Sequence, residues 1–199
     1  MIRPGPGHDL LLTNPQSADQ SLDSFAMNQD DLWVFGYGSL MWRPGFEFSD
    51  RQIALLRGAH RSLCVYSYHH RGTAEKPGLV LGLDHGGSCR GMAYRVPDEK
   101  RDETMAYLTE REQQNYVYRE SLRPVDLIDG RRVKALVYLM DPRHSQYAHG
   151  LTPEQQLAFV KQGEGVSGRC SDYVRNTLEH LHQLGIKDPA LNWIAARLD

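Results

Sequence analysis

The sequence predicts an α+β protein with a small, mostly antiparallel β-barrel or strongly curled sheet, and helices packed on one side or across an end. Three observations support this fold class. Short apolar runs typical of strands follow one another along the chain. Their breakers are mostly Gly, Asp and Pro, which favour turns. Helical signals are fewer, and they do not alternate with the strands as a parallel βαβ sheet requires.

Length and charge limit the classes of partner. The chain has 199 residues, the length of one ordinary or slightly enlarged domain. Lys and Arg total 23 and Asp and Glu total 25, which gives a formal net charge of −2. This balance provides no net attraction to phosphates, so we expect no nucleic-acid partner. No apolar run approaches the roughly 20 residues of a membrane helix, and we expect no membrane partner.

The cysteines point to a reducing compartment. Cys64, Cys89 and Cys170 are odd in number and widely spaced, and no CxxC pair occurs. The sequence therefore predicts neither a zinc site nor a redox dithiol. The N-terminal segment lacks the pattern of a signal peptide. We expect a cytoplasmic protein.

The chain divides into two parts. Residues 1–30 are rich in Pro, Gly and polar residues, and we expect them to form a flexible N-terminal leader. Residues 31–199 form the predicted domain, beginning with the apolar run 32–35 that stops at Gly36. Asp129-Gly130 lies between two further runs and predicts a hairpin. The strands predicted after the first are 52–58, 62–66, 79–83, 91–96, 122–127 and 132–140.

Three helices are predicted. The first covers residues 98 to about 111. The second begins at Thr152-Pro153-Glu154-Gln155, a capping box with proline at the first helical position, and Gly163 can end it. Ser171 is the expected N-cap of the third. The apolar stripe of this last helix is Val174, Leu178 and Leu181.

The first candidate site is the turn that follows the first strand. Gly36 and Gly38 flank Tyr37 there. Glycine permits positive φ and lets a ligand approach the backbone closely. Successive N–H groups in such a turn can hold a carboxylate or an oxyanion. An ordinary tight turn with an aromatic plug is the equally simple alternative.

The second candidate is Glu112. Met105, Leu108 and Glu112 share one helix face because they lie at positions i, i+3 and i+7. A carboxylate carried into the interior has a raised pKa, which suits proton transfer near neutrality. Glu110 falls off this stripe and is expected in solvent. A buried structural ion pair with an arginine is the alternative for Glu112.

A polar loop contains His69, His70 and Arg71. These residues could bind an anion or a metal. Adjacent side chains rarely point to one ion, and no third ligand has helical spacing to them. We therefore interpret the loop as a polar surface segment or lid rather than a metal site.

The stretch 163–168 matches the pattern G-x-G-x-x-G. A dinucleotide site requires a strand before this motif and a helix opening inside it. Here a predicted helix precedes the glycines, so we predict no nucleotide site. The turn can still present Ser167 and Gly168 to a neighbouring pocket.

The motifs occur in a distinctive order. They are Trp33 to Leu40 with Trp42, His70-Arg71-Gly72, Pro77-Gly78, Gly91 to Arg95, Tyr107-Leu108 with Arg111-Glu112 and Tyr116, and Ser167-Gly168-Arg169 with Tyr173. This ordered set resembles the ChaC-type γ-glutamylcyclotransferases, which act on glutathione. The resemblance spans residue 33 to about residue 185. The separation of the R-E and S-G-R motifs makes it specific.

The resemblance implies a γ-glutamylcyclotransferase-like barrel with flanking helices. It also implies cleavage of glutathione to 5-oxoproline and Cys-Gly, without water, metal or organic cofactor. By the family pattern Glu112 matches the catalytic glutamate. The positions that match substrate-binding residues are Val34, Phe35, Gly36, Tyr37, Gly38, Ser39, Leu40, Tyr116 and Tyr147.

One departure concerns the substrate. Several relatives carry Phe-Trp after the strand arginine, whereas Arg61 is followed here by Ser62-Leu63-Cys64. If that position touches the Cys-Gly half, selectivity differs. Two alternatives therefore stay open. One is a cyclotransferase for other γ-glutamyl amines or amino acids, and the other is a non-catalytic regulatory binding protein.

Overall fold

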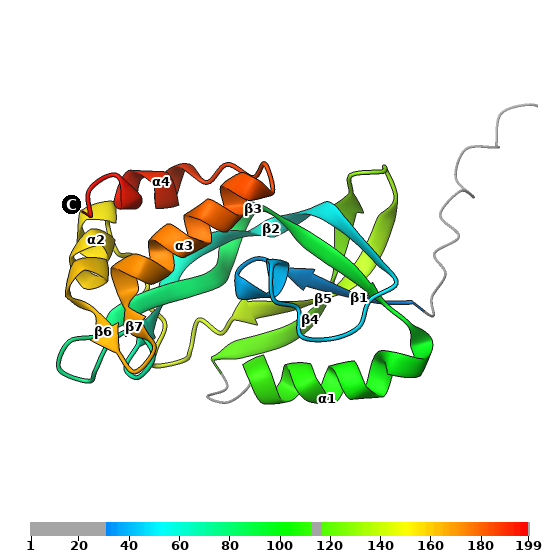
Figure 1. The fold of residues 1–199 in the computed structure, drawn as a ribbon, viewed down its shortest axis with the longest axis horizontal. Coiled ribbons are helices and arrows are strands. Elements are labelled where there is room, and N and C mark those ends of the chain that lie inside the picture. Colours follow the sequence, from blue (N-terminus) through cyan, green and yellow to red (C-terminus); the bar gives the residue numbers. More distant parts are fainter. Residues whose placement is uncertain (1–30, 113–116, 199) are drawn as a thin grey trace, which may run out of the picture.

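The computed structural model describes residues 31–112 and 117–198, and it contains a closed five-stranded barrel (Figure 1). The predicted leader, residues 1–30, and the predicted site residue Tyr116 lie outside the described residues. The strand order around the barrel is β1-β3-β2-β4-β5. The strands are β1 (Leu32–Gly36), β2 (Asp50–Ser67), β3 (Gly78–Val96), β4 (Tyr118–Leu127) and β5 (Arg132–Met140). The predicted α+β class with a small, mostly antiparallel barrel is confirmed.

Strand β1 closes the barrel. It pairs antiparallel with β3 along its whole length and parallel with β5 at Trp33 and Val34. Every residue of β1 is buried. A strand covered on both faces reads as a continuous apolar run, which explains why β1 shows no alternation of polar residues.

Two of the predicted strand breaks are wrong. Strands β2 and β3 have 18 and 19 residues and run through the positions of Gly58, Gly86 and Gly87. Gly58 has a φ of 83° and lies at a shift in the β2–β3 register. Gly86 and Gly87 also have positive φ. Gly58 stands opposite Gly86 and Gly87 at one bulge, which bends and twists the long hairpin so that it can wrap into a barrel.

The helices gather in two places (Figure 1). Helix α1 lies along one side of the barrel, whereas α2, α3 and α4 lie together at the other side. Short 3₁₀ turns, η1 (Ser39–Met41) and η2 (Asp98–Lys100), follow β1 and precede α1. The longer helices are α1 (Arg101–Glu112), α2 (Pro153–Gln162), α3 (Cys170–Gln183) and α4 (Pro189–Ala195). A small hairpin of β6 (Glu164–Gly165) and β7 (Gly168–Arg169) joins α2 to α3.

The two predicted helix caps have different outcomes. The capping box is confirmed, because the Thr152 hydroxyl accepts from the Gln155 amide and the Gln155 side chain accepts from the Thr152 amide. The cap at Ser171 is wrong, since α3 already begins at Cys170. The Cys170 amide donates to the Gly163 carbonyl, and its thiol donates to the Leu79 carbonyl. Tertiary contacts therefore fix this helix start.

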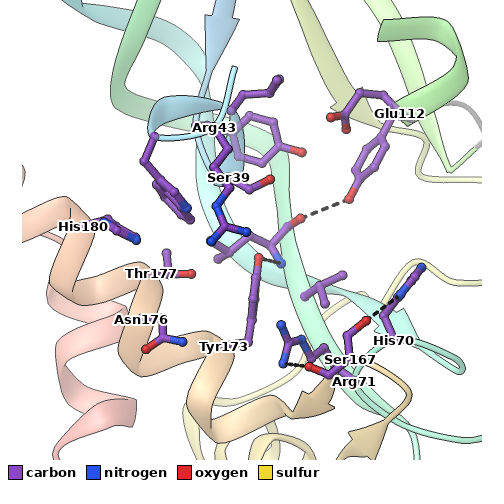
Figure 2. Close-up of a pocket in the computed structure, with 17 residues that line it drawn as sticks. Ser39, Arg43, His70, Arg71, Glu112, Ser167, Tyr173, Asn176, Thr177 and His180 are labelled. Carbon is purple, nitrogen blue, oxygen red and sulfur yellow. Dashed lines mark hydrogen bonds between the residues drawn. The ribbon is translucent and has the colours of Figure 1, made fainter. Parts of the chain in front are cut away.

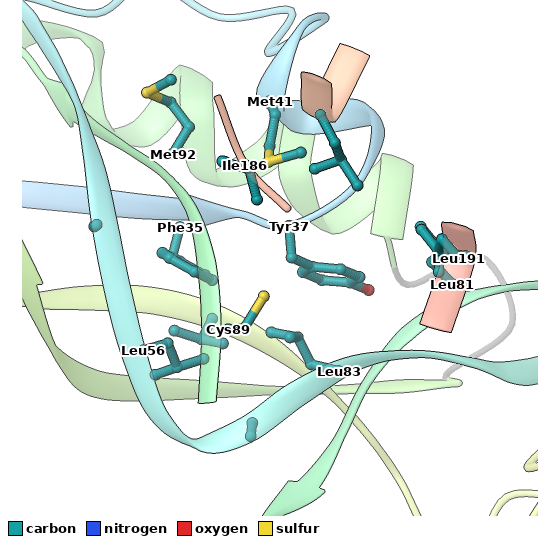
Figure 3. Close-up of a cluster of buried hydrophobic side chains, with 14 of the residues drawn as sticks. Phe35, Tyr37, Met41, Leu56, Leu81, Leu83, Cys89, Met92, Ile186 and Leu191 are labelled. Atoms are coloured by element: carbon teal, nitrogen blue, oxygen red, sulfur yellow. The ribbon is translucent and has the colours of Figure 1, made fainter. Parts of the chain in front are cut away.

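One apolar core runs from the barrel into the helical layer. It contains Phe35 and Leu56 of the barrel together with Val174 and Leu191 of α3 and α4 (Figure 3). The predicted α3 stripe is confirmed, since each of its members is buried. A second cluster holds α1 against the barrel through Leu108. No helix in the described parts of the chain is long and apolar enough to cross a membrane.

Candidate active site

A cavity of about 460 Å³ opens where β1 ends (Figure 2). Volumes in this range are typical of small-molecule sites. One wall is the turn after β1, and the opposite wall is helix α3. The last residue of α1 and the first residue of β4 line it as well. The cavity therefore lies between the two helical regions of the molecule.

The turn after β1 is held from the barrel side. A Cβ at Gly36 would lie 3.2 Å from the Met41 amide nitrogen, so a larger residue would push the turn open by a few tenths of an ångström. The Tyr94 hydroxyl donates to the Met41 carbonyl at 2.6 Å. The Arg61 side chain donates to the Tyr37 carbonyl, also at 2.6 Å. These bonds fix the turn before any ligand arrives.

The turn offers donors to the cavity. Amides at the start of a helix have no acceptor within it. Among the described residues no acceptor is paired with the backbone N–H of Ser39 or Leu40. Both residues line the cavity. The turn therefore leaves two backbone N–H groups unpaired, among the described residues, at the wall of the cavity.

Glu112 ends helix α1 and faces the cavity. Leu108, one turn earlier on the same face, is completely buried, whereas Glu110 is exposed, as predicted. The Glu112 side chain is 16% exposed, and its Oε1 lies 3.2 Å from Nε of Arg111. Burial raises the pKa of the Glu112 carboxyl, and the Arg111 guanidinium opposes part of that rise. The predicted alternative, an ion pair with an arginine, is present, but this pair lies at a cavity.

Arg111 joins the end of α1 to the turn after β1. Its guanidinium donates to the Arg43 carbonyl at 2.8 Å and to the Ser39 hydroxyl at 2.9 Å. It also donates to the Tyr107 hydroxyl within its own helix at 2.6 Å. The position of Glu112 relative to the turn is therefore fixed by its sequence neighbour.

Two tyrosines lie beside Glu112, of which Tyr37 is buried and Tyr118 is half-buried. Burial raises the pKa of Tyr37 well above its usual value, and the nearby Tyr118 and Glu112 raise it further. Burial also raises the pKa of Tyr118, whose hydroxyl donates to the Leu81 carbonyl at 3.1 Å. Both phenols stay neutral at physiological pH and offer hydroxyl groups to the cavity. Tyr118 carries no local sequence signal that would have singled it out.

Helix α3 presents a polar stripe to the cavity. Tyr173, Asn176, Thr177 and His180 all line it and lie at positions i, i+3, i+4 and i+7. The Tyr173 hydroxyl accepts from the Leu81 amide at 3.2 Å. His180 stacks on Trp42 with ring centroids 4.4 Å apart. Of these four residues only Tyr173 stands in one of the motifs singled out from the sequence; the helical spacing of the other polar residues was the signal that could have found them.

The glycine-rich stretch and the histidine loop pack against each other. The Val166 and Ser167 amides donate to the His69 and His70 carbonyls, both at 3.0 Å. Arg71 donates to the Ser167 carbonyl at 2.5 Å. Ser167, His70 and Arg71 line the cavity, so the predicted polar loop forms part of its rim. In the described parts of the chain, no group of three or more His, Cys, Asp or Glu residues is placed to hold a metal ion.

The predicted site residues fall into three groups. Glu112 and the turn residues from Tyr37 to Leu40 line one cavity. Val34, Phe35 and Gly36 are buried in β1, and they are not among the described residues that line the cavity. The Tyr147 hydroxyl donates to the Asp84 carboxylate at 2.7 Å, and Tyr147 is likewise absent from the described lining.

Comparison with known proteins gave consistent matches. The family of ChaC-like proteins matches residues 32–198. The glutathione-specific γ-glutamylcyclotransferase of Escherichia coli is 36% identical over 92% of this chain and 80% of its own length. The human glutathione-specific γ-glutamylcyclotransferase 1 is 35% identical over 81% of this chain and 76% of its own. A crystal structure of the yeast glutathione-specific enzyme has a TM-score of 0.75 at 22% identity, covers 85% of this chain and 96% of its own, and supports the fold.

Proposed function

The chain belongs to the ChaC-like family, and on that basis we propose that it cleaves glutathione to 5-oxoproline and cysteinyl-glycine. The observation that carries this proposal is one cavity shared by a carboxylate and a turn with unpaired backbone N–H groups. Glu112 lies in it with a raised pKa, and the amides of Ser39 and Leu40 line the same cavity. A ring closure within the γ-glutamyl group needs a base and a donor for negative charge at one place.

The reaction begins with a proton transfer. The α-amine of the γ-glutamyl group is an ammonium at neutral pH, and an ammonium has no lone pair with which to attack. The Glu112 carboxylate accepts a proton from it. A base whose pKa lies closer to the working pH performs this transfer more effectively. Burial raises the pKa of Glu112 and so brings it closer to the working pH.

The freed amine then attacks the γ-carbonyl carbon and closes a five-membered ring. The carbonyl oxygen carries the negative charge of the tetrahedral intermediate. Glu112 returns its proton to the amide nitrogen and the carbon–nitrogen bond breaks. The ring nitrogen still carries one surplus proton, which passes through Glu112 to the amine of cysteinyl-glycine, so that this product leaves as an ammonium. The remaining γ-glutamyl part is 5-oxoproline, so water is not consumed. General acid–base help of this kind is worth about 10² to 10⁴ in rate.

The turn amides have two possible partners in this scheme. Ser39 and Leu40 can hold the α-carboxylate of the γ-glutamyl group or the developing oxyanion. Each role favours the folded-back conformer of the substrate, because attack requires the amine and carbonyl to meet. Tyr37 and Tyr118 complete the wall near Glu112. The three free, buried cysteines support a reducing compartment, and we infer that the enzyme acts in the cytoplasm.

Product analysis tests the proposal. The purified protein is incubated with reduced glutathione, and 5-oxoproline, cysteinyl-glycine and glutamate are quantified over time. We expect the first two in a one-to-one ratio and no glutamate. Glutamate in place of 5-oxoproline would show hydrolysis. Turnover of other γ-glutamyl amines or amino acids in preference to glutathione would change the substrate class. Absence of turnover on the whole panel would favour a regulatory binding protein.

A further inference from the structure

A buried hydroxyl on α3 has no partner. Thr177 is 1% exposed, and its Oγ1 makes no hydrogen bond to the described chain. The residue lines the cavity. A buried hydroxyl without a partner destabilises a protein unless something else bonds it. Because Thr177 lies in the wall of a cavity, a bound ligand is the simplest partner for its hydroxyl.

The neighbouring side chain on α3 is available as well. Asn176 lines the cavity beside Thr177, and its amide makes no hydrogen bond to any described residue. An amide and a hydroxyl on adjacent positions of one wall supply donors and acceptors for a peptide unit. Tyr173, on the same stripe, already bonds Leu81. Thr177 and Asn176 therefore both keep bonding capacity that no described residue uses.

A cation faces these two residues from the opposite wall. Figure 2 shows the Arg43 side chain extending from the turn after β1 toward Thr177. The charged residues of the described lining are Arg43, Arg71 and Glu112. Arg71 is already bonded to the Ser167 and Arg169 carbonyls. No described carboxylate pairs with the Arg43 guanidinium, which leaves a planar cation suited to a carboxylate.

The position of the reaction decides which part of the substrate meets this group. The γ-glutamyl end must lie at Glu112 and the Ser39 and Leu40 amides. The leaving half carries one peptide unit and a terminal carboxylate. We propose that Arg43, Asn176 and Thr177 form the subsite for the leaving cysteinyl-glycine, with Arg43 pairing with the glycine carboxylate. This inference rests on the proposed function, and it assigns specificity for the tripeptide to α3 and the turn.

Binding to an inactive variant tests the subsite without relying on turnover. In the Glu112→Gln background, calorimetry compares glutathione with its glycine ethyl ester, which lacks the terminal charge. We expect tighter binding of glutathione. Arg43→Gln should weaken glutathione binding about 10- to 100-fold, the range for hydrogen bonds to charged groups, and leave ester binding unchanged. Arg123→Gln, on the exposed face of β4, makes the same change of charge away from the cavity and serves as control.

Thr177 gives a second, independent test. Thr177→Val removes a hydroxyl that has no partner in the free protein, so thermal stability should stay level or rise. Binding of glutathione should fall about 3- to 10-fold, in the range for one neutral hydrogen bond. Binding of γ-glutamylcysteine, which lacks the second peptide unit, should not change. Thr177→Ser keeps the hydroxyl and should retain binding.

Two results would overturn the subsite. Equal losses for glutathione, its ester and γ-glutamylcysteine in Arg43→Gln would assign Arg43 to the γ-glutamyl carboxylate. A lower melting temperature of Thr177→Val with unchanged glutathione binding would make Thr177 structural. Failure of the proposed function shows separately, as absence of 5-oxoproline from the wild-type protein. Arg43-dependent discrimination against the ester would support the subsite in that case too.

Discussion

Two arginine–carboxylate pairs stand on opposite sides of the turn after β1. Arg61 and Asp188 are 3.1 Å apart, and Arg111 and Glu112 are 3.2 Å apart. Both pairs are largely withdrawn from solvent. Arg61 holds the carbonyl of Tyr37 from the barrel side, whereas Arg111 holds the Ser39 hydroxyl from the cavity side. The same kind of pair therefore supports the turn twice.

The two carboxylates differ in whether one oxygen is left without a partner among the described residues. Asp188 uses one oxygen for Arg61 and the other to accept from the Leu191 amide, which caps α4. Glu112 uses Oε1 for Arg111, and its Oε2 has no partner among the described residues. Glu112 also lines the cavity. A carboxylate whose oxygens are both bonded stabilises the fold, whereas one with an unused oxygen at a cavity can move a proton.

The largest expected effect comes from Glu112→Gln. We expect the rate of 5-oxoproline formation to fall by at least about 10² to 10⁴, the range for general acid–base catalysis. Stability at neutral pH should not fall. Because the folded pKa of Glu112 is raised, its favourable contribution is complete below the unfolded pKa and is lost as pH rises through the folded pKa. Turnover and thermal unfolding are measured together. Glu110→Gln, at an exposed position on the same helix, is the control.

Asp188→Asn should have the opposite effect, with a large loss of stability and little loss of turnover. Removing one partner of a buried pair leaves an uncompensated charge, here Arg61, and costs about 3 to 5 kcal/mol of unfolding free energy. Turnover per folded molecule should stay within a few-fold of wild type. Denaturant unfolding and activity at low temperature check this. Asp172→Asn, at an exposed position of α3, is the control. If Asp188→Asn lost turnover while its stability stayed at the wild-type value, the Arg61–Asp188 pair would not be purely structural, and the two pairs would not differ in role.

Arg111→Gln should change the pH dependence. The guanidinium lowers the pKa of Glu112 against the effect of burial, so its removal raises that pKa further. The acid limb of the kcat/KM profile should move to higher pH. Arg111→Lys keeps the charge and should move the limb less. An acid limb that stays in place in both variants would remove Arg111 from the electrostatics of Glu112.

The smallest effect is expected at Tyr37, which lies between the two pairs. Its carbonyl is bonded to Arg61, and its ring lines the cavity. Tyr37→Phe should raise KM a few-fold, in line with the loss of one hydrogen bond worth about 1 kcal/mol. Tyr37→Ala is a poor test, because Tyr37 is buried and truncation would cost stability. Steady-state kinetics of the Phe variant measure the effect, and an unchanged KM would exclude a substrate contact by the hydroxyl.

The sequence was most informative where a local rule sets the structure. The Thr152 capping box, the α1 face that carries Leu108 and Glu112, and the turn at Gly130 with its φ of 92° follow from neighbouring residues alone. Gly58 shows the limit. A positive φ serves a turn or a bulge equally well, and pairing with a distant strand decides between them.

The site was predictable only in part. Glu112 and the turn from Tyr37 to Leu40 stand in recognisable motifs, and they line one cavity. Tyr118 and Thr177 are 59 positions apart in sequence, and their elements meet through β3, where Leu81 bonds both Tyr118 and Tyr173 of α3. Cys170 starts α3 in place of the predicted Ser171 because a bond to Leu79 outweighs a local cap.

The central claim is that the Glu112 carboxyl has a pKa raised by burial, and one oxygen without a partner among the described residues, at the reaction centre. A carbon-13 NMR titration of the Glu112 carboxyl in wild-type protein, assigned with Glu112→Gln, measures its pKa directly. We expect the pKa of Glu112 to lie above the ordinary value of about 4.3. The acid limb of kcat/KM for glutathione should fall at the same pH as this pKa. A Glu112 carboxyl that titrates at or below the ordinary value, or an acid limb at another pH, would contradict it.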